Sequence, residues 1–289
     1  MASTETRMNR ELKLFLKHFL LLLLALSMVC PFLWMLGASF KPNIEIEHLS
    51  LLPEDPQPRN FAVVLRQAPD PHTGQLLNLD FPKWYFNSFF VAAWVTSLQV
   101  MTSAMAAFAF SRLAWRGRDT VFLFYLGTMM IPSVVLMLPN YQVMVKLGLV
   151  NTYRGLILPM AFSAFGTFLL RQFMITLPRS YDEAAEIDGA SPLQLFLDII
   201  LPLARPGVVA LAILTFLGNF QSFFWPLVMV KDDYLRTIPI GLLSFQTDYG
   251  QQTELIMAAT VMNIVPLVIL FIVMQRQLIS GIQVGGVKG

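Results

Sequence analysis

The chain has 289 residues, of which 56% are hydrophobic and only 13% are charged. A soluble domain is typically about 45–50% apolar and about 25% charged, so this composition excludes an ordinary soluble domain and predicts an integral membrane protein. The net charge of +2, without a Lys/Arg run interleaved with aromatic residues, also argues against a nucleic-acid partner.

The N-terminal part begins with a polar, basic segment, residues 1–17, followed by an apolar run at 18–40. A cleavable signal has an apolar core of about 7–15 residues, whereas this run exceeds 20 residues and lacks a small-residue cleavage site. We therefore expect a retained first span. Residues 41–83 are rich in prolines and acids, which is typical of a long aqueous loop, and Trp84 marks the return to the membrane interface.

Five more apolar runs are near the roughly 20 residues that cross about 30 Å of hydrocarbon. They lie at 87–110, 120–138, 156–177, 207–230 and 255–275. Pro132 interrupts the third run, and a short polar crossing at 140–154 is expected before the fourth. The predicted fold is thus an all-α membrane protein with six transmembrane helices. Most Lys and Arg residues fall at the termini, at 111–119 and around 171–205, so these parts are predicted to face the cytoplasm.

A polar segment at 180–192 separates the fourth and fifth runs and predicts two short helices with a sharp break. Ser180 and Glu183 have capping-box spacing for the first helix, and Gly189 suits the positive φ that follows a helix end. Ser191 and Gln194 repeat that capping spacing, with a proline at the first helical position.

The second short helix is expected to end before Pro202 and to bury one apolar face. That face would consist of Leu193, Phe196, Leu197 and Ile200.

The string Glu183-Ala184-Ala185-Glu186-Ile187-Asp188-Gly189-Ala190, followed by Ile200-Leu201-Pro202-Leu203 and Pro206, resembles the EAA loop of ABC importer permeases. In that family the loop is the coupling helix that docks on an ATP-hydrolysing subunit. The resemblance covers most of the chain from about Trp84 onward. It implies that the residues coupling to the ATPase are Glu183, Ala184, Ala185, Asp188, Gly189, Ala190 and Pro202.

Two further stretches resemble the carbohydrate-uptake branch of this family, maltose-transporter permeases included. They are Phe224-Trp225-Pro226-Leu227 and the C-terminal Gly285-Gly286-Val287-Lys288-Gly289. The resemblance implies that residues 231–254 form a periplasmic loop reaching the solute-binding protein. It also implies that the tail enters the interface between ATPase subunits through Gly285, Gly286 and Lys288.

The same resemblance implies a bacterial inner-membrane location, with both termini cytoplasmic, and an assembly that transports by alternating access. The partners would be a second permease subunit in a heterodimer, two ATP-binding subunits, an extracytoplasmic solute-binding protein, and a sugar or oligosaccharide substrate. The expected parts are an N-terminal segment (1–17), a first span (18–40), a periplasmic loop (41–83), a permease core (84–280), an EAA loop within it (178–206) and a tail (281–289).

The chemistry that the sequence lacks is also informative. There is no G-x-x-x-x-G-K-[S/T] phosphate loop, so no cofactor is expected on this chain, and ATP and Mg would bind a partner ATPase. The three histidines lack metal-ligand spacing, and the single cysteine, Cys30, permits no internal disulfide. The carboxylates of Asp182, Glu183, Glu186 and Asp188 lie within two turns of one exposed helix, which favours a docking surface over a catalytic pair.

Polar residues inside the spans are candidates for the translocation pathway, because desolvation is costly unless they face protein or water. Serine and threonine can bond to their own helix backbone, which leaves Asn219, Gln221 and Asn263 as the better candidates. Phe224 and Trp225 are predicted to add stacking or gating groups. Arg171, near the end of the fourth run, is expected to reach the cytoplasmic interface.

Two alternatives remain open. One is an importer of the same superfamily for glycerol phosphate, amino acids or peptides; the other is a membrane-embedded enzyme or scaffold. An anionic substrate would favour buried Lys or Arg in the pathway, and none is evident mid-span, which favours a neutral sugar.

Overall fold

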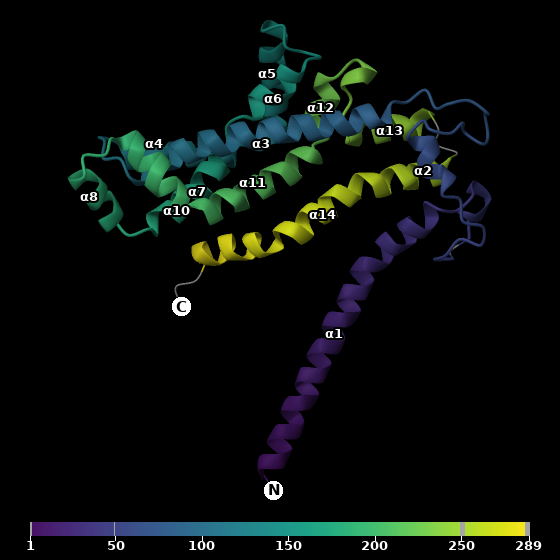
Figure 1. Cartoon of the computed structure of the whole chain (residues 1–289), viewed down its shortest axis with the longest axis horizontal. Helices are drawn as coiled ribbons and strands as arrows, with labels where there is room; N and C mark the ends of the chain where they lie inside the picture. The colour runs from purple at the N-terminus through teal and green to yellow at the C-terminus, as the bar shows by residue number, and fades with distance from the viewer. Residues whose placement is uncertain (1, 49, 249–251, 287–289) are drawn as a thin grey trace. The chain divides into compact units, whose positions relative to one another are not determined.

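The computed structural model describes the backbone of residues 2–48, 50–248 and 252–286, and the side chains of 11–48, 50–243, 245–246 and 252–275. Over these residues the regular structure is helical, without a β-strand (Figure 1). The chain divides into two compact units. Unit 1 comprises residues 1–78 with 244–264, and unit 2 comprises 79–243 with 265–289.

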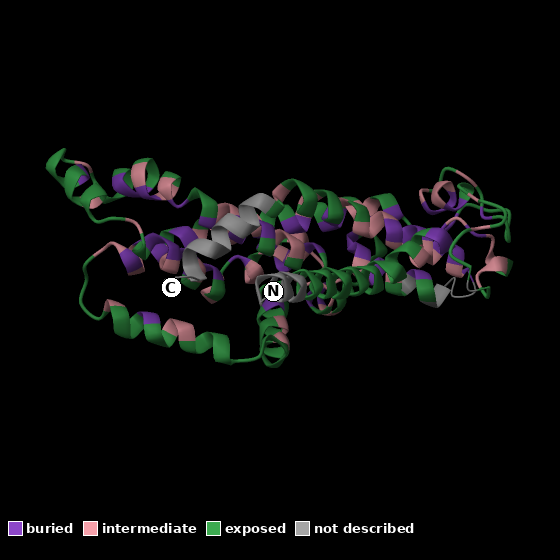
Figure 2. Cartoon of the chain, turned by 90° about the horizontal axis from the view of Figure 1, so that it is seen from below, coloured by how far each residue is buried: buried purple, intermediate pink, exposed green. Residues whose placement is uncertain are grey.

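Unit 1 begins with α1 (Ala2–Ala38), which contains Pro31 within its length. Residues 11–33 of this helix are exposed, and they form the green helix that leads away from the N mark in Figure 2. The portion Glu11–Ala38 is long and apolar enough to cross a membrane. An apolar helix without a protein partner requires lipid or another chain to cover it.

The proline-rich loop after α1 is packed around buried polar side chains, with two short helices, η1 (Asn43–Glu45) and α2 (Arg59–Val64). Lys41 is 0% exposed, and its ammonium donates to the carbonyl oxygens of His48 (3.0 Å) and Ser50 (2.8 Å). The side-chain amide of Asn60 donates to the carbonyls of Ser39 (3.1 Å) and Lys41 (2.9 Å). These bonds replace water on groups that would otherwise be costly to bury.

A second polar cluster joins this loop to the start of α14 (Thr253–Gly286) within unit 1. Asp70 is buried, and burial alone would raise the pKa of its carboxyl. Hydrogen bonds from the backbone of His72 (2.9 Å) and from the side chains of Gln252 (2.9 Å) and Thr73 (2.9 Å) outweigh burial, and the pKa lies below its usual value. The ring of His72 also contacts the buried carboxylate of Glu254 at 3.2 Å.

Unit 2 is built on three packed helices: α3 (Phe81–Ser111), α7 (Ala164–Ile175) and α11 (Arg205–Phe220). They lie side by side (Figure 1). The N-terminus of α3 is capped by Asp80, whose carboxylate accepts from the backbone N–H of Lys83 at 3.2 Å. This helix therefore starts six residues before the predicted second span. The other elements of unit 2 are α4 (Arg118–Gly127), η2 (Thr128–Met130), α5 (Ser133–Lys146), α6 (Tyr153–Ile157), η3 (Leu158–Met160), α8 (Ser180–Ile187), α9 (Pro192–Gln194), η4 (Leu195–Ile200), α10 (Leu201–Leu203), α12 (Phe224–Met229), η5 (Asp233–Leu235) and α13 (Ile238–Asp248), whose last residues belong to unit 1.

Several predicted spans are bent pairs of helices. The interruption predicted at Pro132 is confirmed, because α4–η2 and α5 meet there at 98°. The helical stretch Tyr153–Met160 and helix α7 meet at 44° across a short break, residues 161–163. The hydroxyl of Ser163 caps α7 by accepting from the N–H of Gly166. The polar crossing predicted at 140–154 is wrong in its first half, since α5 continues to Lys146.

The fifth predicted span, 207–230, is also corrected. It is not one helix, because α11 ends at Phe220 and α12 starts at Phe224. Pro226 lies in the first turn of α12, where its missing N–H costs no helix bond. A proline at this place fits a helix start better than a helix interior.

Two hydrophobic clusters hold unit 2. One joins the C-terminal half of α3, α7 and α11 to the 180–203 segment, and includes Phe108, Leu170, Phe196 and Leu211. The other joins the N-terminal half of α3 to α5, α6 and α12, and includes Val95, Met144, Leu156 and Met229. The long helix α3 thus contributes to both clusters.

Candidate functional site

Residues 180–203, hereafter the coupling segment, form a short helix, a sharp turn and a second helix. The first helix, α8, ends at Ile187, and the chain reverses at Gly189, which has φ +77° as predicted. A Cβ at this position would meet no atom within 4 Å. Glycine is therefore favoured here by the backbone conformation and not by crowding.

One of the two predicted caps is present. At the second helix, the N–H of Ser191 donates to Gln194 Oε1 (2.8 Å), and the N–H of Gln194 donates to Ser191 Oγ (3.3 Å). The box predicted for Ser180 and Glu183 is wrong, because Arg179 occupies the N-cap position and Ser180 is already helical. A residue with helical φ and ψ is inside the helix and cannot act as its N-cap.

The second helix does not end before Pro202 as predicted. A π-helical turn at Leu195–Ile200 is followed by α10, and Pro202 lies in the first turn of α10. A π turn bonds residues five apart and so changes which side chains point inward. The predicted apolar face is corrected accordingly: Phe196 and Ile200 are buried together with Leu195, but Leu193 is 63% exposed and Leu197 is 48% exposed.

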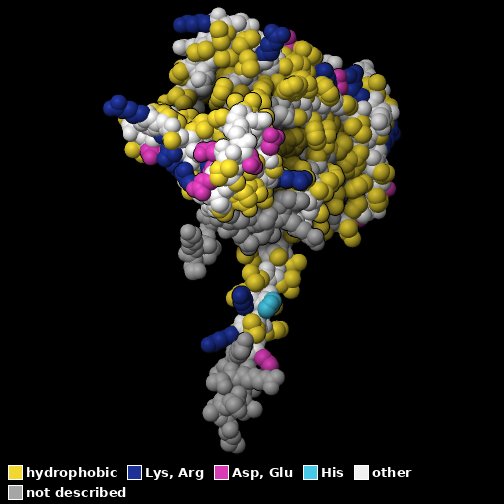
Figure 3. Space-filling view, turned by 60° about the vertical axis from the view of Figure 1, so that its left-hand side comes forward, with side chains coloured by type: hydrophobic (Ala, Val, Ile, Leu, Met, Phe, Trp, Pro, Cys, Tyr) yellow, Lys and Arg dark blue, Asp and Glu magenta, His cyan; other side chains and the backbone are white. Residues whose placement is uncertain are grey.

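The outer surface of the coupling segment combines apolar and acidic side chains. Ile187 is 86% exposed, and Glu183, Glu186 and Asp188 are exposed around it. Figure 3 brings the left-hand end of Figure 1, where α8 is labelled, toward the viewer and shows acidic side chains grouped among hydrophobic ones. The tip of α8 therefore presents one apolar side chain among three carboxylates.

The inner surface of the coupling segment is packed. Ala185 is 4% exposed and lies in the cluster with Leu170 and Phe196, and Ala190 packs against that cluster. Ala184, Gly189 and Pro202 are exposed. The predicted coupling residues are thus divided between a packed inner face and a free outer face.

A buried arginine connects the coupling segment to two long helices. Arg112 follows the last residue of α3, and its guanidinium pairs with the carboxylate of Asp182 in α8 at 2.5 Å. The same group donates to the carbonyl oxygens of Met174 and Leu177 at the end of α7, the latter at 2.9 Å. The Arg112 side chain is only 2% exposed and that of Asp182 is 13% exposed. Hydrogen bonds to charged groups are about twice as strong as neutral ones, and a guanidinium can hold several acceptors in a fixed plane.

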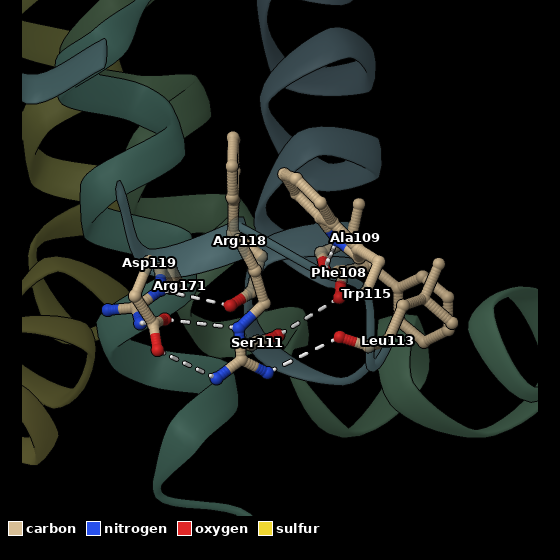
Figure 4. Close-up of polar contacts among 9 residues, drawn as sticks. Phe108, Ala109, Ser111, Leu113, Trp115, Arg118, Asp119 and Arg171 are labelled. Atoms are coloured by element: carbon tan, nitrogen blue, oxygen red, sulfur yellow. Dashed lines mark hydrogen bonds and ion pairs between the residues drawn. The ribbon is translucent and has the colours of Figure 1, made fainter. Parts of the chain in front are cut away.

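A second arginine cluster lies beside it, where α3 turns into α4 (Figure 4). Arg118 donates to the carboxylate of Asp119 (3.1 Å) and to the carbonyl of Leu113 (3.3 Å). Arg171, from α7, lies 3.6 Å from Asp119, donates to the carbonyl of Phe110 (3.2 Å) and stacks over the ring of Phe122 at 4.1 Å. The guanidinium of Arg171 is therefore occupied within the protein.

Sequence reasoning did not find the Arg112–Asp182 pair. Arg112 was only one of the basic residues at 111–119, and Asp182 was expected among the carboxylates of an exposed docking surface. That expectation is corrected for Asp182, whose side chain is 13% exposed and paired with Arg112. Seventy positions separate them, and no local spacing relates them. The available signal was a single arginine directly after a long apolar run.

The predicted pathway residues have different environments. Asn219 donates to the carbonyl of Thr215 on its own helix (2.8 Å), a bond that the sequence argument had not expected of asparagine. Gln221 and Phe224 are exposed, whereas Trp225 is buried and donates its indole N–H to the carbonyl of Gly155 (3.2 Å). Asn263 belongs to unit 1, and its side-chain oxygen is buried without a hydrogen bond. A role of these residues in transport stays a prediction.

The C-terminal tail is partly described. The backbone of α14 continues as a helix through Gly285 and Gly286. Lys288 lies outside the described residues.

Comparison with known families gives a match over residues 99–284 to the family described as "Binding-protein-dependent transport system inner membrane component". The matched region contains the coupling segment, α7 and α11, together with the C-terminal half of α3.

Curated relatives cover nearly the whole chain. The arabinooligosaccharides transport system permease protein of Halalkalibacterium halodurans is 38% identical, over 92% of this chain and 93% of the relative. The trehalose/maltose transport system permease protein of Thermococcus litoralis is 35% identical, over 95% and 98%. The sn-glycerol-3-phosphate transport system permease protein of Agrobacterium fabrum is 32% identical, over 95% and 97%.

A solved structure has the same fold. It is a chain from the crystal structure of a bacterial ABC transporter involved in the import of the acidic polysaccharide alginate. The TM-score is 0.80 at 23% identity, and the alignment covers 91% of this chain and 95% of the other.

Proposed function

Because this chain belongs to the family of inner-membrane components of binding-protein-dependent transport systems, we propose that it is one permease subunit of an ATP-driven sugar importer. It would form half of the translocation pathway beside a second permease subunit. Two ATP-binding subunits would supply the energy, and a solute-binding protein would deliver a sugar or oligosaccharide.

The observation that carries the proposal is the two-faced coupling segment. Its inner face is held to α3 and α7 through Arg112 and the buried alanine Ala185, whereas its outer face leaves Ile187 and three carboxylates exposed. An element that is fixed on one side and free on the other is suited to transmit force from a partner. ATP and Mg would be bound by that partner, since the chain has no phosphate-binding loop.

Six membrane spans follow if each bent pair is one crossing. Among the described residues, three helices are long and apolar enough by themselves: Glu11–Ala38, Phe81–Ser111 and Thr253–Gln275. Three bent pairs of described helices satisfy the same criteria together: Arg118–Met130 with Ser133–Lys146, Tyr153–Met160 with Ala164–Ile175, and Pro192–Leu203 with Arg205–Phe220. In the last pair we assign Arg205–Phe220 to the membrane, because Pro192–Leu203 belongs to the coupling segment. An even number of crossings places both termini on one side, and the distribution of Lys and Arg favours the cytoplasm of a bacterial inner membrane.

The mechanism that fits these parts is alternating access. Closure of the ATP-binding subunits would displace the coupling segment, and the packed helices α3, α7 and α11 would move with it. A cavity between the two permease subunits would then open toward the solute-binding protein. The tail with Gly285, Gly286 and Lys288 would contact the ATP-binding subunits, and residues 231–254 would contact the solute-binding protein.

A sugar is favoured over an anionic solute, although several relatives, that of Agrobacterium fabrum among them, are named for sn-glycerol-3-phosphate. An anionic solute calls for an available cation in the pathway. Arg171 lies within α7, but Asp119, the carbonyl of Phe110 and the ring of Phe122 already occupy it. Binding of candidate solutes to the cognate solute-binding protein, measured by calorimetry, separates the two substrate classes.

The docking role can be tested with two exposed isoleucines. Ile187→Lys changes the tip of the coupling segment, where the side chain is 86% exposed, and Ile44→Lys changes a side chain that is 83% exposed in unit 1. Burying an isoleucine in a partner contributes about 1.5–3 kcal/mol, so Ile187→Lys is expected to lower co-purification of the ATP-binding subunit about tenfold or more. Ile44→Lys is the control and should leave it unchanged. Equal recovery of the ATP-binding subunit with Ile187→Lys would contradict the docking role.

A further inference from the structure

Helix α3 contacts two distant parts of unit 2 that the proposed function assigns to different partners. It packs against η4, in the coupling segment, and against η5, in the loop formed by residues 230–238. α3 is a single helix from Phe81 to Ser111. In contrast, its neighbours are interrupted: α4–η2 meets α5 at 98°, and α11 ends before α12.

The C-terminal end of α3 is fixed to the coupling segment by Arg112. Its guanidinium joins Asp182 of α8 to the last carbonyls of α7, and the side chain is almost completely buried. Breaking a buried pair by removing one partner leaves an uncompensated charge, so α3 and α8 are expected to move together at this point.

The N-terminal end of α3 is fixed to the 230–238 loop by Asn87, which is 0% exposed. Its amide nitrogen donates to the carbonyl oxygens of Tyr234 and Arg236, both at 2.8 Å. The hydroxyl of Tyr153 donates to its amide oxygen at 2.6 Å. The neighbouring Ser88 accepts from the N–H of Ile238 at 2.8 Å. Side chains of α3 thus hold the loop by hydrogen bonds to the loop's backbone.

The two attachment points of α3, at Asn87 and Arg112, lie far enough apart for the helix to link distant parts of unit 2. Asn87 and Arg112 are 25 positions apart, which corresponds to about 38 Å along an α-helix. No Pro or Gly, the common causes of a sharp kink, lies between them, so α3 is suited to move as one rigid body, whereas a bent pair can hinge at its break. Packing on α7 and α11 supports α3 along its length.

We propose that α3 is a strut that carries displacement of the coupling segment to the 230–238 loop, with Arg112 and Asn87 as its two positioning residues. This inference rests on the proposed function, because that function gives the two ends their partners. In it, the solute-binding protein contacts the loop and the ATP-binding subunits contact the coupling segment, so α3 links solute delivery to ATP hydrolysis.

The test uses the complete transporter in proteoliposomes and measures ATP hydrolysis with and without the loaded solute-binding protein. Asn87→Ala removes the hydrogen bonds that hold the 230–238 loop to α3. Asp182→Asn weakens the Arg112–Asp182 pair while keeping the shape of the side chain. The control, Ser97→Ala, removes an α3 hydroxyl that bonds only to the carbonyl of Ala93 in the same helix. Tyr153→Phe is a milder substitute should Asn87→Ala fail to assemble, since it removes only the hydroxyl on Asn87.

Coupling between two sites is typically about 5- to 150-fold, so each single variant is expected to reduce stimulation by the solute-binding protein at least about fivefold. The double variant, Asn87→Ala with Asp182→Asn, should lose no more stimulation than either single variant. A helix detached at one end no longer carries displacement, so detaching the other end has no further effect. Stimulation at the wild-type level in Asn87→Ala or Asp182→Asn, or losses that multiply in the double variant, would overturn the strut. A wild-type chain that binds no ATP-binding subunit would instead overturn the proposed function, and the strut with it.

Discussion

The turn at Gly189 gives the sharpest test of the coupling segment, because unit 2 contains a matched glycine. Gly189 has φ +77° and Gly148 has φ +65°, and a Cβ at either position would meet no atom within 4 Å. Replacing either residue with alanine therefore adds the same type of backbone strain without a steric clash. The two positions differ in their place in the fold: Gly148 follows α5, and Gly189 follows α8.

The left-handed conformation costs a non-glycine residue about 1–2 kcal/mol. Gly189→Ala and Gly148→Ala should thus destabilise the folded chain by similar amounts, corresponding to about a 5- to 30-fold change in the folded/unfolded ratio. The apparent unfolding temperature of the purified protein measures this shared effect. Gly189→Ala is further expected to displace the tip of α8, and so to reduce both the bound ATP-binding subunit and sugar uptake.

The comparison separates the effect of the turn's geometry on transport from its effect on the stability of the protein. If both variants unfold at the same lowered temperature and only Gly189→Ala loses uptake, the geometry of the coupling segment is responsible. Uptake that falls equally in both variants would refute the reasoning, since general destabilisation would then explain the loss. Wild-type uptake in Gly189→Ala would refute it as well.

Three other predictions concern packing and charge. Gly241→Ala would place a Cβ 2.2 Å from the ring of Trp84, which is fully buried; we expect a destabilisation of about 1–3 kcal/mol, seen as a lower unfolding temperature. Lys41→Met leaves two carbonyls without their donor and should cost about 1.5–3 kcal/mol, measured as faster proteolysis within residues 41–78. The lowered pKa of Asp70 stabilises the fold at pH values above its usual 3.8, and this contribution is lost as pH falls through the lowered pKa; Asp70→Asn should therefore flatten the pH dependence of unfolding in this acidic range.

Local features of the coupling segment could be predicted because they depend on neighbouring residues. The positive φ at Gly189 and the capping box of Ser191 and Gln194 follow from short-range chemistry, and both are confirmed. The cap at Ser180 failed because the helix starts one residue earlier than the pattern suggested. Ser180 satisfies the local capping rule and Arg179 does not, so the capping pattern placed the helix start one residue too late.

Features that depend on distant residues could not be predicted. The Arg112–Asp182 pair joins residues 70 positions apart, and the contacts of Asn87 reach residues almost 150 positions away. Hydropathy located the apolar runs but gave no indication of the breaks after Met160 and Phe220. In the second case a signal existed, because Pro226 at the third residue of a helix is typical of a helix start.

Some residues of the coupling segment are explained by packing or backbone conformation within this chain, and others are not. Ala185 is buried against the helices, so a larger side chain would push α8 away, and Gly189 is required by its backbone conformation. Nothing within unit 2 requires an exposed isoleucine at 187 or an exposed carboxylate at Glu183, since neither side chain contributes to the packed cluster. An apolar side chain left 86% exposed gains nothing from the fold of its own chain. The proposed docking role would give Ile187 a partner on the ATP-binding subunit, and the Ile187→Lys and Ile44→Lys comparison tests that contact directly.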